Sequence, residues 1–84
     1  MSVILVTGAS TGIGQATALH LASQGHRVFA GVRSPHTAQE LKEKIAAQEL
    51  AVELIQLDIT DQDSVNNAVS AIMASEGRID ALVN

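Results

Sequence analysis

Three glycines lie close together near the start of the chain, in residues 7–14, TGASTGIG. An apolar run precedes this segment and good helix formers follow it, so we expect it to join a strand to a helix. There Gly8 allows a tight turn, Gly12 lets the backbone approach a ligand, and Gly14 lets the helix pack on the sheet. The first helical turn offers free N–H groups and the positive end of the helix dipole, which indicates pyrophosphate binding. The other loop residues expected beside such a ligand are Ser10, Thr11 and Ile13.

The same glycines are compatible with other interpretations. Glycines in a strand-to-helix loop can serve turn geometry alone. Residues 8–12 also fit Gly-x-Ser-x-Gly, the nucleophile elbow of α/β-hydrolases. Against the elbow, Gly12 and Gly14 would each cost its helix about 1 kcal/mol, and the chain has no room for the later Asp and His of a triad. A P-loop is excluded because no Gly-Lys-Ser/Thr follows Gly8 at the required spacing.

Alternating strand and helix signals predict the scaffold. Apolar runs with β-branched residues predict strands at 3–7, 27–32, 52–57 and 79–83. Helices are expected at 13–24, from a Ser34 N-cap with Pro35 at N1 to about Gln48, and from a Thr60 N-cap to Gly77. This βαβαβαβ order requires parallel strands with right-handed crossovers. We therefore predict an α/β fold, a Rossmann-type doubly wound parallel sheet with strand order 3-2-1-4.

Thr7, Gly8, Gly12 and Gly14 match in full the Thr-Gly-x-x-x-Gly-x-Gly motif of the short-chain dehydrogenase/reductase family, which the chain resembles. Residues 57–60, LDIT, look like the family segment whose Asp binds the adenine amino group. Residues 80–84, DALVN, look like the approach to its Asn-Asn-Ala-Gly segment. The resemblance covers the whole chain and implies further cofactor-binding residues, namely Asp58, Ile59 and Asn84.

Each of these later residues also has a structural alternative. Asp58 is compatible with a turn position before Thr60, and Asp80 with a turn or capping role. Asn84, as the last residue given, is compatible with having no role at all. These alternatives stay open on the sequence alone.

The end of the second predicted strand bears on the choice of cofactor. Where an acidic residue would bind the ribose 2′-OH of NAD, residues 31–34 read GVRS. Arg33 can pair there with a 2′-phosphate and Ser34 can donate a second hydrogen bond, so NADP(H) is favoured over NAD(H). Two observations weigh against this preference: Thr11 stands where many NADP-dependent relatives carry a basic residue, and Arg33 is also compatible with a solvated loop charge.

The chemistry of the family rests on a Tyr and a Lys in Tyr-x-x-x-Lys, together with a Ser. This chain contains no Tyr, so we assign no catalytic residue within residues 1–84. The resemblance implies the N-terminal dinucleotide-binding part of a longer parent protein, cut before its catalytic half. That parent would be an NADP(H)-dependent oxidoreductase acting on a carbonyl or alcohol.

Two other function classes stay open. One is a stand-alone, non-catalytic dinucleotide-binding or sensing module, and the other is an unrelated nucleotide-binding or hydrolytic α/β protein. An exposed apolar strand at residues 79–83 would invite aggregation, which argues against the stand-alone module. A coding sequence that continues past Asn84 into Asn-Ala-Gly and a later Tyr-x-x-x-Lys would select the oxidoreductase.

Composition and charge exclude several further classes. The 84 residues allow one domain or part of one. A net charge of −4 with five scattered Lys and Arg provides no footprint for nucleic acid or an anionic membrane. No metal site is expected, since Cys is absent and the three His show no ligand spacing: His20, His26 and His36. Without a signal segment or membrane span, a cytoplasmic location is expected, and a homo-oligomeric parent stays open.

Overall fold

The computed structural model describes residues 1–84, except for the side chain of Thr37. In this described part, one sheet contains β1 (Val3–Val6), β2 (Arg27–Val32), β3 (Val52–Gln56) and β4 (Ala81–Val83). The α-helices are α1 (Gly12–Ser23), α2 (Gln39–Gln48) and α3 (Gln62–Glu76), and a 3₁₀-helix, η1 (Pro35–Thr37), precedes α2. All neighbouring strands are parallel and the order is β3-β2-β1-β4, which confirms the predicted topology.

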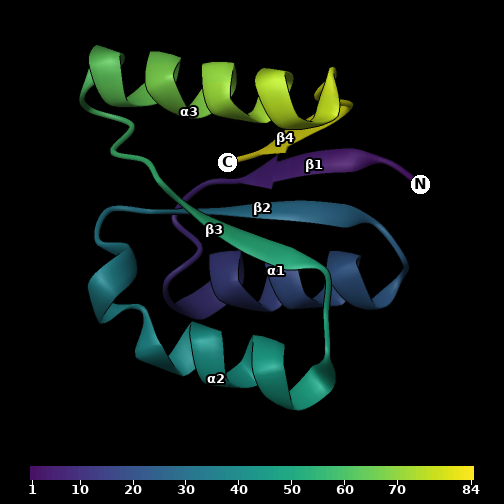
Figure 1. Cartoon of the computed structure of the whole chain (residues 1–84). Coiled ribbons are helices and arrows are strands. Elements are labelled where there is room, and N and C mark those ends of the chain that lie inside the picture. Colours follow the sequence, from purple (N-terminus) through teal and green to yellow (C-terminus); the bar gives the residue numbers. More distant parts are fainter.

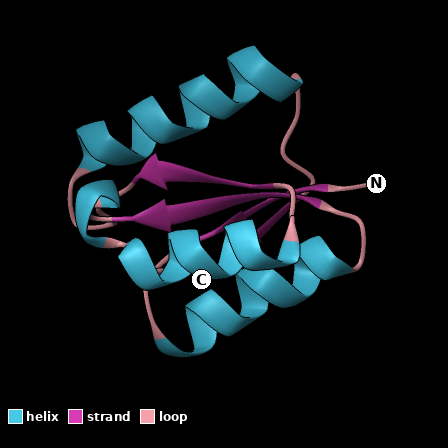
Figure 2. Ribbon diagram, turned by 60° about the horizontal axis from the view of Figure 1, so that its bottom comes forward, coloured by secondary structure: helices cyan, strands magenta, loops and turns pink.

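Helices cover both faces of the sheet, with α1 and α2 on one side and α3 on the other (Figure 1). The view in Figure 2 shows the resulting three layers. Because successive side chains of a strand point to opposite faces, β1 supplies Ile4 and Val6 to one core, with α1, and Val3 and Leu5 to the other, with α3. All of β1 is buried, as its unbroken apolar run predicts.

The predicted start of the second helix is wrong. Ser34 makes no side-chain capping hydrogen bond, and Pro35 opens the 3₁₀-helix η1 instead of an α-helix. The backbone of Ala38 then leaves the helical region, with φ −86° and ψ 46°, and α2 begins only at Gln39. Ala38 is buried in the core with Leu41, so the break turns the chain inward before α2 starts.

The predicted N-cap of the third helix is also wrong by one residue. The carboxylate of Asp61, and not the hydroxyl of Thr60, accepts from the N–H groups of Asp63 at 3.0 Å and Ser64 at 3.4 Å. The Thr60 hydroxyl instead donates to Asp58 at 2.7 Å. Two neighbouring residues can each cap a helix, and the bond to Asp58 decides between them.

None of the helices described combines the length and apolar character that a membrane crossing requires.

Gly14 marks the closest approach of α1 to the end of β1. A Cβ at this position would lie 2.9 Å from the carbonyl carbon of Gly8, closer still to its oxygen, and 3.2 Å from the carbonyl oxygen of Thr7. Gly12 differs, because it has open space around it but a positive φ of +59°. The first position therefore excludes a side chain by contact, and the second by backbone conformation.

We expect Gly14→Ala to lower the free energy of unfolding of the protein by about 3 kcal/mol, because the new methyl group meets backbone atoms that must move. Gly12→Ala should cost about 1 kcal/mol through its left-handed conformation. Helix propensity alone predicts the opposite sign at Gly14, a gain of about 1 kcal/mol. Urea denaturation measures the free energy of unfolding of both variants. A Gly14→Ala variant as stable as the unmutated protein would contradict the packing described.

Candidate functional site: a cleft at the carboxyl ends of the strands

A cleft of about 720 Å³ opens at the carboxyl ends of the strands. Since the strands are parallel, these ends meet at one edge of the sheet, and the chain order reverses between β1 and β4. Open α/β sheets bind ligands at such a switch point. The volume lies within the range of ligand pockets in proteins, about 300 to 1,000 Å³.

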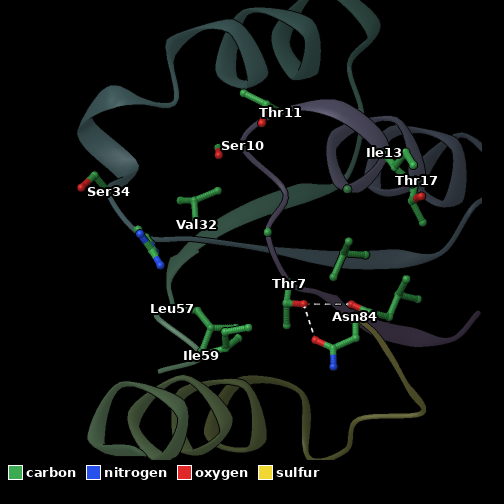
Figure 3. A pocket seen from close by; sticks show the side chains of 15 residues that line it. Thr7, Ser10, Thr11, Ile13, Thr17, Val32, Ser34, Leu57, Ile59 and Asn84 are labelled. Carbon is green, nitrogen blue, oxygen red and sulfur yellow. Dashed lines mark hydrogen bonds between the residues drawn. The ribbon is translucent and has the colours of Figure 1, made fainter. Parts of the chain in front are cut away.

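The cleft has two ends joined by the glycine loop (Figure 3). One end is formed by residues that follow or complete β2 and β3, namely Val32, Ser34, Leu57 and Ile59. The other end is formed by residues of α1 and by the residue after β4, namely Ile13, Thr17 and Asn84. Ser10 and Thr11 lie between them, so an elongated ligand could cross the loop from one end to the other.

Most of the residues predicted from the sequence line this cleft. They are Gly8, Ser10, Thr11, Ile13, Gly14, Arg33, Ser34, Ile59 and Asn84. The two outside the lining are Gly12, which begins α1, and Asp58, which lies between the lining residues Leu57 and Ile59. The fold thus gathers the predicted residues at one place, and their binding of a cofactor stays a prediction.

The glycine loop presents N–H groups at the start of α1. Helical bonding begins with the N–H of Gln15, which donates to the Thr11 carbonyl at 3.3 Å. The N–H groups of Gly12, Ile13 and Gly14 in the first turn therefore have no intrahelical acceptor. No acidic residue lies in that turn to compete for them. This terminus has the donors and the dipole direction that bind phosphate groups.

The loop is tied to the sheet on both sides. The Ala9 N–H donates to the carbonyl of Gly31, in β2, at 3.0 Å, and the Thr7 N–H donates to the carbonyl of Val83, in β4, at 2.9 Å. The Thr7 hydroxyl donates to the side-chain oxygen of Asn84 at 2.8 Å, as Figure 3 shows. These bonds hold Asn84 at the mouth of the cleft.

Asp80 fastens the other end of β4. Its carboxylate accepts from the Val3 N–H at 2.7 Å and from Arg78 Nε at 3.0 Å. The Val3 N–H is the main cause that lowers the pKa of Asp80, and Arg78 adds to it. Asp80 thus has a structural role, although it holds β4 against β1 instead of forming a turn or a helix cap, and it lies outside the cleft lining.

Asp58 forms a turn with Thr60, the structural alternative that the sequence indicates for it. Its Oδ1 accepts from the hydroxyl of Thr60 at 2.7 Å and from the Thr60 N–H at 3.0 Å, and Arg33 Nε lies 4.0 Å away. The Thr60 hydroxyl is the largest cause that lowers the pKa of Asp58, followed by the Thr60 N–H, while burial opposes them and Arg33 helps slightly. All of these described contacts use Oδ1, which leaves Oδ2 to accept from a ligand.

Six residues that line the cleft were not predicted as site residues, namely Val6, Thr7, Thr17, Val32, Leu57 and Val83. Thr17 lies one turn after Ile13 on α1, and an i, i+4 search from the loop would have found it. Val32 and Leu57 were assigned to strands, yet both are buried lining residues at the carboxyl ends of β2 and β3. Their position at strand ends is the signal that identifies them.

In the described part of the chain, no group of three or more His, Cys, Asp or Glu could hold a metal ion.

We expect Thr60→Val to raise the pKa of Asp58, because the variant keeps the side-chain shape and loses the hydroxyl that donates to the carboxylate. Carbon-13 NMR titration of the carboxyl group measures it, with Thr60→Ser as the control that keeps the donor. A lowered pKa means that the turn's stabilisation is present above the pKa of an unfolded Asp, about 3.9, and is lost as pH falls through the folded value. An unchanged titration in the Val variant would assign the shift to another cause.

Comparison with known proteins identifies the fold's relatives. The family profile described as short chain dehydrogenase matches residues 2–84. An uncharacterized oxidoreductase of Myxococcus xanthus is 40% identical over 79 residues, which cover 94% of this chain and 31% of that protein. A metagenomic short-chain oxidoreductase solved in complex with NADP has a TM-score of 0.86 at 33% identity, covering 96% of this chain and 37% of that one. Actinorhodin polyketide ketoreductase with NADPH has a TM-score of 0.89 at 29% identity, covering 99% of this chain and 32% of that one.

The chain spans about a third of the length of each of these proteins. Within that third the agreement is continuous, since the family profile extends from residue 2 to residue 84. The strand order, the glycine loop between β1 and α1 and the cleft beside it agree with this match. The chain belongs to the short-chain dehydrogenase family.

Proposed function

We propose that residues 1–84 form the NADP(H)-binding N-terminal part of a single Rossmann-type domain. The longer parent protein would be an oxidoreductase that acts on a carbonyl or alcohol substrate. The observation that carries the proposal is the cleft itself, which joins the free N–H groups of α1 to Arg33 at the end of β2. The NADP and NADPH named with two similar structures support the choice of cofactor class.

The residues present fit the parts of such a cofactor. The apolar side chains of Val32, Leu57 and Ile59 suit a flat adenine ring, with Asp58 beside them as an acceptor for its amino group. The pyrophosphate would meet the N–H groups of the first turn of α1. Of the cleft-lining side chains that the structure describes, Arg33 is the one with a positive charge, so it would take the 2′-phosphate.

The nicotinamide ring of a bound cofactor would supply or accept a hydride at the end of the cleft near Ile13 and Asn84. In this proposal the residues of the chain bind and orient the cofactor and perform no proton transfer. The proton donor and its partners are assigned to the parent protein beyond Asn84, because the Tyr-x-x-x-Lys pair has no counterpart in residues 1–84.

The state of Arg33 favours selection of a 2′-phosphate. Its side chain is 75% exposed, and the 4.0 Å ion pair with Asp58 is long. A pair of this kind contributes little free energy, so the guanidinium can turn to a phosphate that accepts two hydrogen bonds. The backbone beneath it is held, since Gln56 Nε2 donates to the Arg33 carbonyl at 3.4 Å. The main chain of Arg33 is thus hydrogen-bonded, whereas its guanidinium group is exposed and can change its orientation.

We expect Arg33→Ala in the parent protein to weaken NADP(H) binding by about 10- to 100-fold, the equivalent of one charge-assisted phosphate contact. Binding of NAD(H), which lacks the 2′-phosphate, should change by less than about twofold. The measurement is the ratio of the two dissociation constants by fluorescence titration at fixed ionic strength, because salt alone weakens phosphate pairing.

Lys42→Ala is the matched control, since it removes one positive charge from an exposed position on α2 outside the cleft lining. Its ratio should equal that of the unmutated protein. A ratio that Arg33→Ala also leaves unchanged, or an unmutated parent that prefers NAD(H), would reject the assignment of Arg33 and the cofactor preference with it.

A further inference from the structure

Gln15 is a buried polar residue on the first helix. Only 4% of it is exposed, and it shares the covered face of α1 with Ala18 and Ala22. Its Nε2 donates to the carbonyl oxygen of Ser10 at 2.9 Å, and its Oε1 accepts from Lys44 Nζ at 2.8 Å. A buried amide is costly unless both of its ends are hydrogen-bonded, and here both are. The side chain therefore ties α2, through α1, to the glycine loop.

The bond to Ser10 sets the direction of one peptide group in the loop. The Ser10 carbonyl and the Thr11 N–H belong to the same planar trans peptide, so they point in opposite directions. Ser10 and Thr11 line the cleft, whereas Gln15 lies outside the lining. Holding the carbonyl toward Gln15 turns the Thr11 N–H away from it, toward the cleft side. A flipped peptide would instead present a carbonyl oxygen to an anion and repel it.

The loop needs such a tie because its backbone is permissive. Gly8 and Gly12 lie on either side of the Ser10–Thr11 peptide, with φ values of +58° and +59°. A Cβ added at either glycine would have no atom within 4 Å, so the neighbouring structure does not restrain the backbone there. The N–H of Ala9, two residues before Thr11, is already bound to Gly31 in β2. Further along the loop, the orientation of the Ser10–Thr11 peptide decides whether a donor or an acceptor faces the ligand.

Lys44 strengthens this tie from α2. Its ammonium donates to Gln15 Oε1 and also pairs with Glu40 Oε1 at 3.0 Å, one turn earlier on the same helix. A cation on the amide oxygen polarises the amide, which makes its N–H a better donor to Ser10. Half of the Lys44 side chain remains solvated, at 45% exposed, so its contribution is smaller than that of Gln15.

We infer that Gln15 is a positioning residue for cofactor binding, which orients the Ser10–Thr11 peptide so that its N–H faces the phosphates of the dinucleotide. Lys44 supports it through the amide oxygen. The phosphate part of this inference rests on the proposed function, whereas the ordering of the loop by Gln15 does not.

The test uses the parent protein with four substitutions and two readouts. Gln15→Leu removes both bonds, and Gln15→Glu keeps an acceptor for Lys44 while losing the donor to Ser10. Lys44→Met removes the ammonium at an exposed position, and Lys42→Met on the same helix is its control. The readouts are amide hydrogen exchange of residues 8–14 without cofactor and the dissociation constant for NADPH.

Both Gln15 variants should speed exchange in residues 8–14 by about tenfold and weaken NADPH binding by about three- to tenfold, the effect of one hydrogen bond. Lys44→Met should change both by about two- to threefold, and Lys42→Met neither. A Gln15 side chain that served only helix packing would leave exchange and affinity unchanged in Gln15→Leu, which keeps a side chain of similar size at the buried position.

The possible failures are distinguishable. If the unmutated parent binds neither nicotinamide dinucleotide, the proposed function fails, and faster loop exchange in the Gln15 variants still supports the ordering role. If the parent binds NADPH and both Gln15 variants match it in affinity and exchange, the inference is overturned and the proposed function stands. Should Gln15→Leu unfold globally, Lys44→Met decides: unchanged loop exchange and affinity in that variant overturn the inference.

Discussion

The site depends on the burial of β1 on both of its faces. A strand that packs against α1 on one side and α3 on the other, and pairs with β2 and β4, must lie in the middle of the sheet. The loop that follows it then starts at the centre of the carboxyl edge. Gly14 lets α1 begin directly against that loop, so the N-terminus of the helix lies beside the switch point between β1 and β4. The apolar character of residues 3–6 thereby determines where the glycine loop and the N-terminus of α1 lie.

The chain as a whole is negatively charged, whereas the cleft is lined by a positively charged side chain, that of Arg33. The net charge is −4, which opposes binding of an anionic cofactor at long range. For the proposed cofactor, attraction would come from local sources, namely the free N–H groups of α1 and the guanidinium of Arg33. Asp58 lies 4.0 Å from Arg33, within reach of the same ligand, and its lowered pKa keeps it an acceptor at neutral pH. The guanidinium of Arg33 and the carboxylate of Asp58 therefore lie next to each other. Recognition of a phosphorylated adenosine would require such a pair, a cation for the phosphate and an acceptor for the adenine amino group.

The fold could be predicted because its signals are local in the sequence. Short β-branched runs, helical periodicity and glycines recur in one order, and that order determines a parallel sheet. Helix starts were less predictable, because Thr60 and Asp61 both suit an N-cap and only the bond from Thr60 to Asp58 separates them. On α3, Ile72 is fully buried whereas its apolar neighbour Met73 is 44% exposed, since the sheet covers only one side of the helix.

The cleft could be predicted in part for the same reason. Gly8, Arg33 and Ile59 follow strand ends, and parallel topology alone brings strand ends together. The support beneath the loop could not be predicted, because Lys44 and Gln15 are 29 residues apart and no periodic pattern links them. Their contact exists only once α2 packs beside α1.

The most direct test of this account is an NMR titration of the nitrogen-15-labelled protein with NADP. The account predicts that the largest amide shifts fall in residues 8–14, with further shifts at Arg33, Ser34 and Ile59, all at the carboxyl edge of the sheet. Residues 24–26 and 49–51, which lead into the opposite ends of β2 and β3, should hardly change. Saturable shifts confined to another surface, or no shifts at millimolar NADP, would contradict the assignment of this cleft as the dinucleotide site.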